Sequence, residues 1–383
     1  MLVLALVACG GSGGSTSETA SDDGEMGGAS ASGASGGATS TGGAAAVGGK
    51  SGAGGSATGG VTPCTPSTCK GPPAMGKGGV PDGATANVQA ITKLYLGDTT
   101  RAGVASAAAW QEFGFPISGV VYSDATAGAA KHCKPWDGAK PADVIVNGTN
   151  GVDNSFGKNI WPIFLGLTAN ASQQSQDGLT SGAVGLLIVV DGLGAGSDYD
   201  GLGATLYASQ GTLDVTGGTV PPTDWATYVW HPFDAQKGGD PFPSSYVVDN
   251  HWVSAPSGNV EISLWWEGLR LPLVIHHAKL AHRYGIDHKT ATAGDISGVL
   301  SVSEFVTALK SIASKISSSL CMSVALDSPL LQFAQAADIG LDGTQDPNKQ
   351  CDGISIGIGY ESTESLRGDP AAPLVPMDAC PAP

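Results

Sequence analysis

The sequence predicts a β-rich α+β domain, an antiparallel β-sandwich-like fold with a few peripheral helices. Short segments alternate apolar and polar residues, Gly, Asn and Asp turns separate them, and helical patterns are few. The clearest segment, residues 259–268, places Val260, Ile262 and Leu264 on one face and Glu261 on the other. A strand with one buried face and one solvated face is typical of an antiparallel sheet.

The chain begins with an apolar run that ends at Cys9. A run this short cannot span a bilayer, which requires ~20 residues, but it suits the core of a signal peptide. Leu6-Val7-Ala8-Cys9 resembles the lipobox of a bacterial lipoprotein signal, in which the cysteine becomes the lipidated N-terminus. Such a signal normally starts with Lys or Arg, and neither precedes Cys9. We therefore expect a signal longer than residues 1–9; the alternative is a disordered N-terminus with a chance cysteine.

Residues 10–62 are almost entirely Gly, Ser, Ala and Thr. Such a segment buries too little apolar surface to offset the conformational entropy lost on ordering. We predict a disordered tether with a reach of roughly 40 Å, at ~5–6 Å times the square root of the residue number. A collar of Pro and Cys follows at residues 63–79, and residues 80–383 are predicted to form one globular domain.

Composition indicates an exported protein. Of the 383 residues only 14% are charged, 58 are Gly, and the net charge is −16. Nucleic-acid binding relies on clustered Lys and Arg, so this balance argues against it. It argues equally against docking on an anionic membrane through charge. We therefore expect membrane attachment through lipid on Cys9, at the outer membrane or the cell surface.

The seven cysteines support the same location. Removing Cys9 leaves an even number, which can close three disulfides of the kind that persist outside the cytosol. Proximity in sequence predicts the pairs Cys64–Cys69 and Cys321–Cys351. The two cysteines left over would form the third pair, Cys133–Cys380. The spacings lack the Cys-x-x-Cys pairs of zinc fingers.

The remaining elements follow from local patterns. Apolar and β-branched residues predict strand segments at residues 88–96, 144–146, 186–190, 271–280 and 351–360. Helical spacing predicts a short helix over 160–167 and another that Ser301-Val-Ser-Glu304 opens as a capping box. A further helix is expected over about 329–337, with Ser328 as its N-cap.

Two loops carry carboxylates that suggest calcium. Asp191, Asp198 and Asp200 lie in a Gly-rich loop after the strand at 186–190, and Asp153 lies in the oxygen-rich loop at 147–157. Ca²⁺ accepts six to eight such oxygens. The alternative is that both are ordinary turns, because Asn, Asp and Gly dominate turns for conformational reasons. Calcium is the one cofactor that the sequence suggests.

Aromatic residues suggest a second kind of site. Five of them are concentrated in one third of the chain: Trp225, Tyr228, Trp230, Trp252 and Trp265. Exposed rings can stack on sugars, although most Trp residues of β-sandwiches lie in the core. We therefore predict a non-catalytic binding or structural role, with carbohydrate as the candidate ligand.

The alternative function is a secreted glycoside hydrolase. Glu261 and Glu267 share a strand face, but residues six apart along a strand lie roughly 20 Å apart. Glycosidases need carboxyl separations of ~5–9.5 Å, so this pair fails and no catalytic residue is predicted.

Four stretches together resemble a family. They are Trp110 with Phe113-Gly-Phe115, residues 151–160, residues 294–300, and Cys351-Asp-Gly-Ile-Ser-Ile-Gly-Ile358. This combination is similar to uncharacterised lipoproteins that are numerous in large-genome, gliding soil bacteria, and it covers most of residues 85–360. The resemblance implies a surface location. Its motifs carry no known chemistry, so it transfers no catalytic residue.

The lipobox resemblance gives a direct test. In a chain expressed with a complete signal, Cys9→Ala should abolish incorporation of radiolabelled fatty acid and release the protein from membranes, because the substituted residue has no thiol to acylate. Equal labelling of the variant and the parent would show that Cys9 is not the lipidation site.

Overall fold

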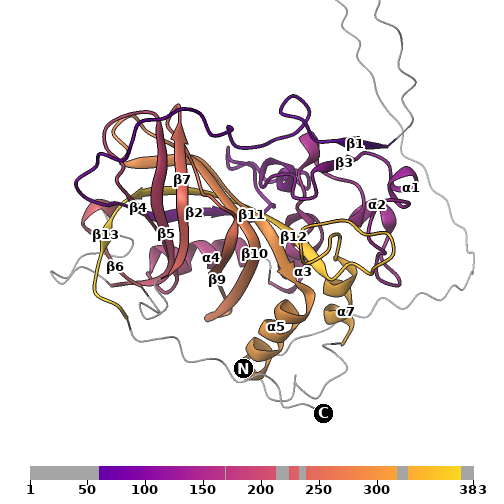
Figure 1. Cartoon of the computed structure of the whole chain (residues 1–383). Coiled ribbons are helices and arrows are strands. Elements are labelled where there is room, and N and C mark those ends of the chain that lie inside the picture. The colour runs from indigo at the N-terminus through magenta and orange to yellow at the C-terminus, as the bar shows by residue number, and fades with distance from the viewer. Residues whose placement is uncertain (1–59, 169, 213–223, 233–238, 317–326, 372–383) are drawn as a thin grey trace, which may run out of the picture. The chain divides into compact units, whose positions relative to one another are not determined.

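The computed structural model describes residues 60–168, 170–212, 224–232, 239–316 and 327–371 (Figure 1). The expected signal, Cys9 and the tether up to residue 59 lie outside these residues, as do Cys321 and Cys380. No helix in these ranges is both long enough and apolar enough to cross a membrane.

One large sheet dominates the domain, and antiparallel pairing is the rule within it. Its strand order is β13-β6-β5-β4-β2-β12-β11-β10-β8-β7, and β9 pairs with β10. The strands are β2 (Asn87–Tyr95), β4 (Gly185–Asp191), β5 (Tyr199–Thr212), β6 (Val229–Pro232), β7 (Asp240–Val248), β8 (His251–Val253), β9 (Gly258–Trp266), β10 (Leu269–Tyr284), β11 (Thr290–Ser301), β12 (Gly353–Glu364) and β13 (Leu366–Arg367). The predicted β-rich α+β class is confirmed.

The sheet bends back on itself. Strand β7 at one end of the order also pairs with β5, from Tyr199 opposite Val247 to Leu206 opposite Asp240, with register shifts on both sides of Leu202. In Figure 1, β5 and β7 cross in front of β2. The two inner faces therefore share one apolar core.

Strand β4 is buried on both faces, as its unbroken apolar run predicts. Leu186, Ile188 and Val190 point into the main core, whereas Leu187 and Val189 pack under a second cluster that contains Tyr207, Tyr228 and Trp230. Strand β9 alternates as expected: Val260, Ile262 and Leu264 are buried and Glu261 is exposed. Glu267 and Gly268 join β9 to β10, both with positive φ, as a two-residue hairpin turn requires.

The helices are α1 (Ala125–Gly128), α2 (Pro141–Val144), α3 (Trp161–Leu167), α4 (Ala171–Thr180), α5 (Val302–Ile316) and α7 (Asp327–Gln335). Residues of α3, α4, α5 and α7 belong to the main core, whereas α1 and α2 pack in a small cluster apart from it. Phe164 of α3, Phe305 of α5 and Phe333 of α7 contact one another in a buried aromatic cluster. These contacts hold the three helices together, because aromatic side chains bury large apolar areas.

The predicted capping box is half formed. Ser301 Oγ accepts a hydrogen bond from the N–H of Glu304 at 3.3 Å, as an N-cap should. The Glu304 carboxylate pairs with His276 Nε2 at 2.7 Å. In a complete capping box this carboxylate would accept from the backbone N–H of Ser301. Here it binds His276 of the neighbouring strand β10.

Two local predictions are wrong. Val144 ends the helix α2, with Pro141 in its first turn, and is not part of a strand. Val144 and Ile145 pack against Tyr122 in a small core of their own, so tertiary contacts override their β propensity. Helix α7 begins at Asp327, which places Ser328 inside it.

Order begins before the predicted collar. Strand β1 (Val61–Pro63) pairs with β3 (Val120–Tyr122), so the last residues assigned to the tether belong to a two-stranded sheet. The short helical turns η1 (Ala109–Glu112), η2 (Thr149–Gly151), η3 (Phe156–Ile160) and η4 (Trp225–Thr227) complete the described elements.

The disulfide scheme is partly wrong. Cys64 and Cys69 are bonded, as predicted. Cys133 is bonded to Cys351, 218 residues away, so the predicted pairs Cys321–Cys351 and Cys133–Cys380 are both overturned. The reason is a tertiary contact: the N–H of Lys134 donates to the Lys349 carbonyl at 2.8 Å and the N–H of Cys351 donates to the Lys134 carbonyl at 3.0 Å, which brings the two cysteines together. Separation in sequence says nothing about such a contact.

The two disulfides should differ in their contribution to stability. In the chain-entropy model, closing the loop between Cys133 and Cys351 contributes about 5 kcal/mol, and closing the short Cys64–Cys69 loop about 2 kcal/mol. The paired substitution Cys133→Ser/Cys351→Ser should therefore lower the free energy of unfolding, measured in urea, more than Cys64→Ser/Cys69→Ser does. Equal losses in the two variants would contradict this ranking.

Candidate functional site

The stretches singled out in the sequence converge on the outer face of β11 and β12. Gly357 and Gly359 leave room there for the segment around Phe113. A Cβ on Gly357 would lie 2.4 Å from the carbonyl oxygen of Phe113, and one on Gly359 would lie 2.3 Å from the Phe113 ring. These glycines allow the backbone to approach the sheet closely.

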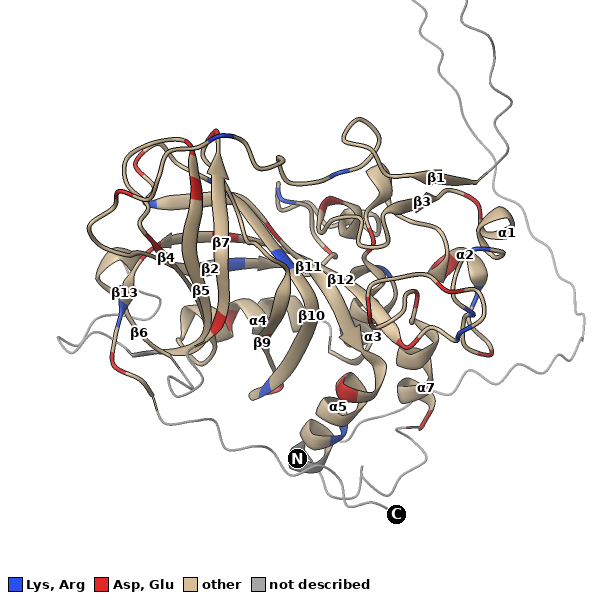
Figure 2. Cartoon of the chain, in the orientation of Figure 1, with Lys and Arg blue, Asp and Glu red and all other residues tan. Residues whose placement is uncertain are grey.

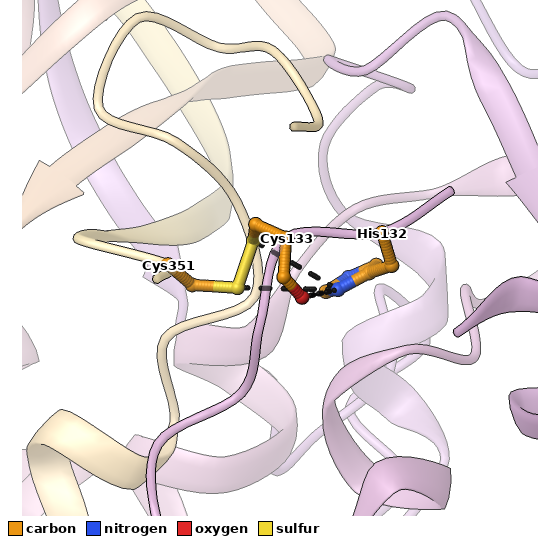
Figure 3. Close-up of side chains that lie close together, drawn as sticks. All are labelled: His132, Cys133 and Cys351. Carbon is orange, nitrogen blue, oxygen red and sulfur yellow. Dashed lines mark hydrogen bonds between the residues drawn. A yellow bond between two sulfur atoms is a disulfide. The ribbon is translucent and has the colours of Figure 1, made fainter. Parts of the chain in front are cut away.

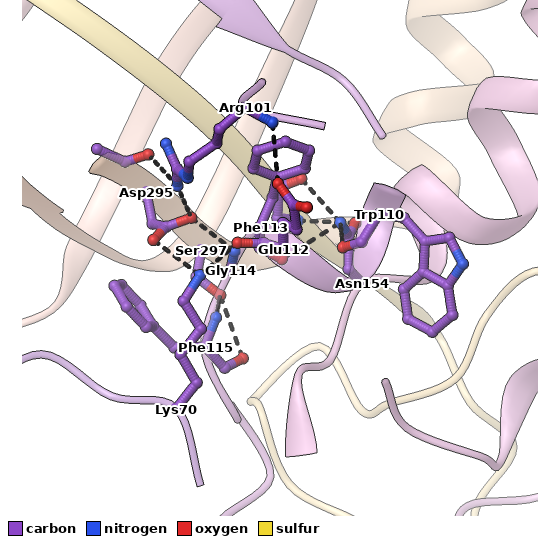
Figure 4. A network of polar contacts seen from close by, with 12 residues as sticks. Lys70, Arg101, Trp110, Glu112, Phe113, Gly114, Phe115, Asn154, Asp295 and Ser297 are labelled. Atoms are coloured by element: carbon purple, nitrogen blue, oxygen red, sulfur yellow. Dashed lines mark hydrogen bonds and ion pairs between the residues drawn. The ribbon is translucent and has the colours of Figure 1, made fainter. Parts of the chain in front are cut away.

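The side chain of Asn154 fixes this docking (Figure 4). Its Nδ2 donates to the carbonyls of Trp110 at 3.0 Å, Phe113 at 3.4 Å and Gly357 at 2.9 Å. Its Oδ1 accepts from the N–H groups of Gly157 and Gly357, each at 2.9 Å. Asn154 is buried, so its amide replaces water for backbone groups that would otherwise lack partners.

Asp295 of β11 organises the polar part of the same surface. Its Oδ1 accepts from the N–H of Gly114 at 3.0 Å and from Arg101 Nη2 at 2.8 Å, and its Oδ2 pairs with Lys70 Nζ at 2.9 Å. Burial raises the pKa of Asp295, and the charges of Lys70 and Arg101 oppose that rise. The pKa of Lys70 is lowered by burial, which Asp295 opposes.

Aromatic rings and a second acid hold the two cations in place. The Arg101 guanidinium lies 5.0 Å from the Phe113 ring centre and 5.8 Å from that of Tyr95. Glu112 Oε2 accepts from the backbone N–H of Arg101 at 2.9 Å, and the Glu112 carbonyl accepts from Lys70 Nζ at 2.5 Å. The guanidinium and ammonium groups are thus positioned before any ligand arrives.

A cleft of about 710 Å³ opens beside this cluster, a size that would admit a small ligand. Basic, amide and hydroxyl side chains line it together with apolar ones. Its lining includes Lys70, Arg101, Gln111, Glu112, Phe115, Thr149, Asn150, His282 and Asp295.

Two buried nitrogens at the cleft lack partners among the described residues: Arg101 Nη1 and His282 Nε2. The other ring nitrogen of His282, Nδ1, lies 2.8 Å from the Tyr360 hydroxyl, and the ring stacks on Trp252. Burial lowers the pKa of His282 to about 3, so this imidazole is neutral at pH 7. Unpaired buried nitrogens are costly in a folded protein, and a ligand or water that accepts from them would remove that cost.

The predicted aromatic platform is wrong for three of its five residues. Tyr228, Trp230 and Trp252 are buried, the two tryptophans completely, and offer no exposed face to a sugar. Trp225 stacks on Trp230 with ring centres 6.1 Å apart. Trp265 is half-buried, and its side chain lies against Gly178 of α4. These rings fill the space between layers, the ordinary use of aromatic residues in a packed sheet.

The Asp153 carboxylate, proposed for calcium in the loop at 147–157, is hydrogen-bonded to backbone N–H groups. Asp153 is buried, and its Oδ2 accepts from the N–H groups of Ile117 and Ser118 at 2.7 and 3.0 Å. Burial raises the pKa of Asp153 to about 6. Its role is to fix the turn that follows Phe115, which is a structural use of the carboxylate.

The other three aspartates lie near one end of β4 and β5. Asp191 is exposed, Asp198 accepts from the N–H of Asp249 at 3.1 Å, and Asp200 Oδ2 accepts from the N–H of Gly78 at 2.8 Å. Within the described ranges, one group alone brings three potential His, Cys, Asp or Glu ligand atoms within 4.8 Å of one another, and it contains none of them. The described structure therefore does not gather these carboxylates into one ligand set, and calcium binding stays a prediction.

Sequence reasoning missed Lys70, Arg101, Asn154 and Asp295. Lys70 and Arg101 lie far from Asp295 in sequence, so no local pattern joins them. Asn154 and Asp295 fall inside two of the stretches that carry the family resemblance. The sequence shows that these stretches resemble a family, and the structure shows which contacts their side chains make. No protein-family model, curated protein or solved structure matches this chain.

A third buried carboxylate, after those of Asp295 and Asp153, gives this region a pH dependence. Asp338 accepts from the backbone N–H of Ser355 at 2.7 Å and from its hydroxyl at 2.5 Å. Burial raises the pKa of Asp338 to about 7. Because the folded-state pKa exceeds the unfolded value of about 3.9, the folded chain binds more protons and its stability falls as the pH rises from about 4 to 7.

We expect Asp338→Asn to flatten this dependence, because the amide oxygen can accept from the N–H of Ser355, the amide NH₂ can donate to the Ser355 hydroxyl, and the group never ionises. The free energy of unfolding, measured in urea between pH 4 and 8, should fall less steeply in the variant than in the parent. Asp137→Asn, at an exposed position, is the matched control and should keep the parent slope. An unchanged slope in Asp338→Asn would refute the assignment.

Proposed function

We propose that this protein is an exported lipoprotein, held at the outer membrane or cell surface through lipid on Cys9, that binds a polar ligand without transforming it. The apolar run before Cys9 and the net charge of −16 support export and anchoring. Two disulfides support an oxidising compartment. The observation that carries the binding role is the cleft at Asp295, with its two positioned cations.

The lining favours an acidic saccharide as the ligand. Lys70 and Arg101 share the single buried carboxylate of Asp295, which leaves an excess of one positive charge in this trio for a ligand carboxylate. Gln111, Thr149 and Asn150 add amide and hydroxyl groups of the kind that pair with sugar hydroxyls. The cleft thus combines a charged end with a neutral polar wall, which matches a sugar acid better than a purely apolar ligand.

The charge distribution argues against nucleic acid as the ligand. Figure 2 shows the few Lys and Arg residues scattered among strands and loops, with Asp and Glu between them. A phosphate backbone would need several basic residues along one track. A ligand with one acidic group needs fewer basic residues, and Lys70 with Arg101 meets that need.

The occupied carboxylates of the cleft favour binding over hydrolysis. Both oxygens of Asp295 are engaged by Lys70, Arg101 and the N–H of Gly114. Glu112 holds the backbone of Arg101. A glycosidase acid or nucleophile must face the scissile bond, and here both acids are turned toward protein donors.

The test is calorimetric titration of the full chain with oligogalacturonate and with the uncharged galactose oligosaccharide of equal length. We expect binding of the acidic sugar that weakens with added salt. Lys70→Gln should weaken it by about tenfold or more, since a hydrogen bond to a charged group contributes about 1.5–3 kcal/mol.

Lys289→Gln is the matched control. Lys289 pairs with Glu364 at 3.5 Å and lies outside the cleft, so its loss should leave the affinity unchanged. Failure of the parent chain to bind any acidic sugar, or equal effects of the two substitutions, would overturn the proposal.

A further inference from the structure

A buried imidazole lies against the long-range disulfide (Figure 3). His132 Nδ1 is 3.8 Å from Cys133 Sγ and 3.9 Å from Cys351 Sγ. All three residues are at most 2% exposed. They are the group noted above whose ligand atoms all lie within 4.8 Å of one another.

These separations are close to those of metal ligands. In a tetrahedral zinc site, with bonds of about 2.3 Å to sulfur and 2.0–2.1 Å to nitrogen, neighbouring S and N ligands lie about 3.6 Å apart and two sulfurs about 3.8 Å apart. Nδ1 of His132 is already near that spacing from both sulfurs. The one large change needed is separation of the sulfurs, which a disulfide holds at about 2.05 Å.

We propose that reduction of Cys133–Cys351 converts this cluster into a site for a soft divalent metal, with Zn²⁺ held by two thiolates and the His132 imidazole. A dithiol reductant supplies two electrons and two protons and ends as a disulfide, while the S–S bond breaks to give two thiols. Zn²⁺ then displaces both thiol protons to solvent. Thiolate and imidazole are the donors that zinc prefers.

The surroundings of the ring suit this role. In the disulfide state Nδ1 lies 2.7 Å from the Cys133 carbonyl and donates to it. The backbone carbonyls of Asp338 and Val144 also lie near the ring. When Nδ1 turns to the metal, its proton moves to Nε2, and a carbonyl acceptor for Nε2–H is the usual partner of a ligating histidine.

A route for the ion is present. Cys133 also lines a second cleft, of about 410 Å³, together with Asp342, Asp346 and Asp352. These carboxylates raise the local concentration of cations at the cleft. The cleft also offers space for the water that would complete a four-coordinate site beside three protein ligands.

The test uses the full chain, reduced with dithiothreitol and desalted under nitrogen, with Co²⁺ as a spectroscopic probe. We expect a thiolate-to-cobalt charge-transfer band in the near ultraviolet that Zn²⁺ displaces and that the oxidised chain lacks. His132→Gln should weaken the binding at least tenfold. Cys64→Ser/Cys69→Ser should retain it, because that disulfide is the matched control without the histidine. No band in the reduced chain, or a band equally strong in His132→Gln, would overturn the proposal.

A readout that needs no variant covers the case in which His132→Gln does not fold. Zn²⁺ added to the reduced parent chain should protect Cys133 and Cys351 from alkylation by iodoacetamide, mapped by mass spectrometry, and should leave Cys64 and Cys69 reactive. Equal alkylation of all four with and without Zn²⁺ would refute the site.

Discussion

The buried amide of Asn154 is the interaction on which the rest of this structure most depends. It joins η1, the start of η3 and the middle of β12 through five hydrogen bonds to backbone groups. Each such bond contributes about 1 kcal/mol net, but an orphaned buried group costs about 1–3 kcal/mol. Asn154 therefore matters mainly because no water can replace it. The segment it fixes carries Phe113, Gly114 and Phe115, against which the cations of the cleft are arranged.

Asp295 depends on that docking. A carboxylate this buried is unfavourable unless it is paired and hydrogen-bonded. Its partners are Lys70, Arg101 and the N–H of Gly114, which come from three separate stretches. The fold must place all three within hydrogen-bonding distance of the carboxylate. The same arrangement that stabilises the carboxylate fixes a guanidinium and an ammonium at the rim of a cleft. The contacts that stabilise the buried carboxylate therefore also position the two cations. Ligand binding would then cost less side-chain entropy than it would with mobile cations.

The Cys133–Cys351 region shows how one contact serves two parts of the fold. The disulfide ties the segment after α1 to the segment before β12. His132 lies beside it, and Asp338 lies near the same ring. A buried imidazole therefore lies beside the disulfide, and the backbone of a residue with a buried carboxylate lies close to that imidazole. The polarity of these two side chains is compensated chiefly by backbone groups and by Ser355.

The sequence by itself determined the β-rich class, the buried strand β4, the β9–β10 hairpin and the Cys64–Cys69 bond. Each follows from a period, a turn or a spacing of a few residues, which local physics fixes. The tertiary structure alone decided that Trp230 and Trp252 are core residues, that Cys133 pairs with Cys351, and that Val144 ends a helix. It alone brought Lys70, Arg101 and Asp295 together. These outcomes depend on which distant segments pack against each other, and a strand pattern records which face is buried but not what covers it.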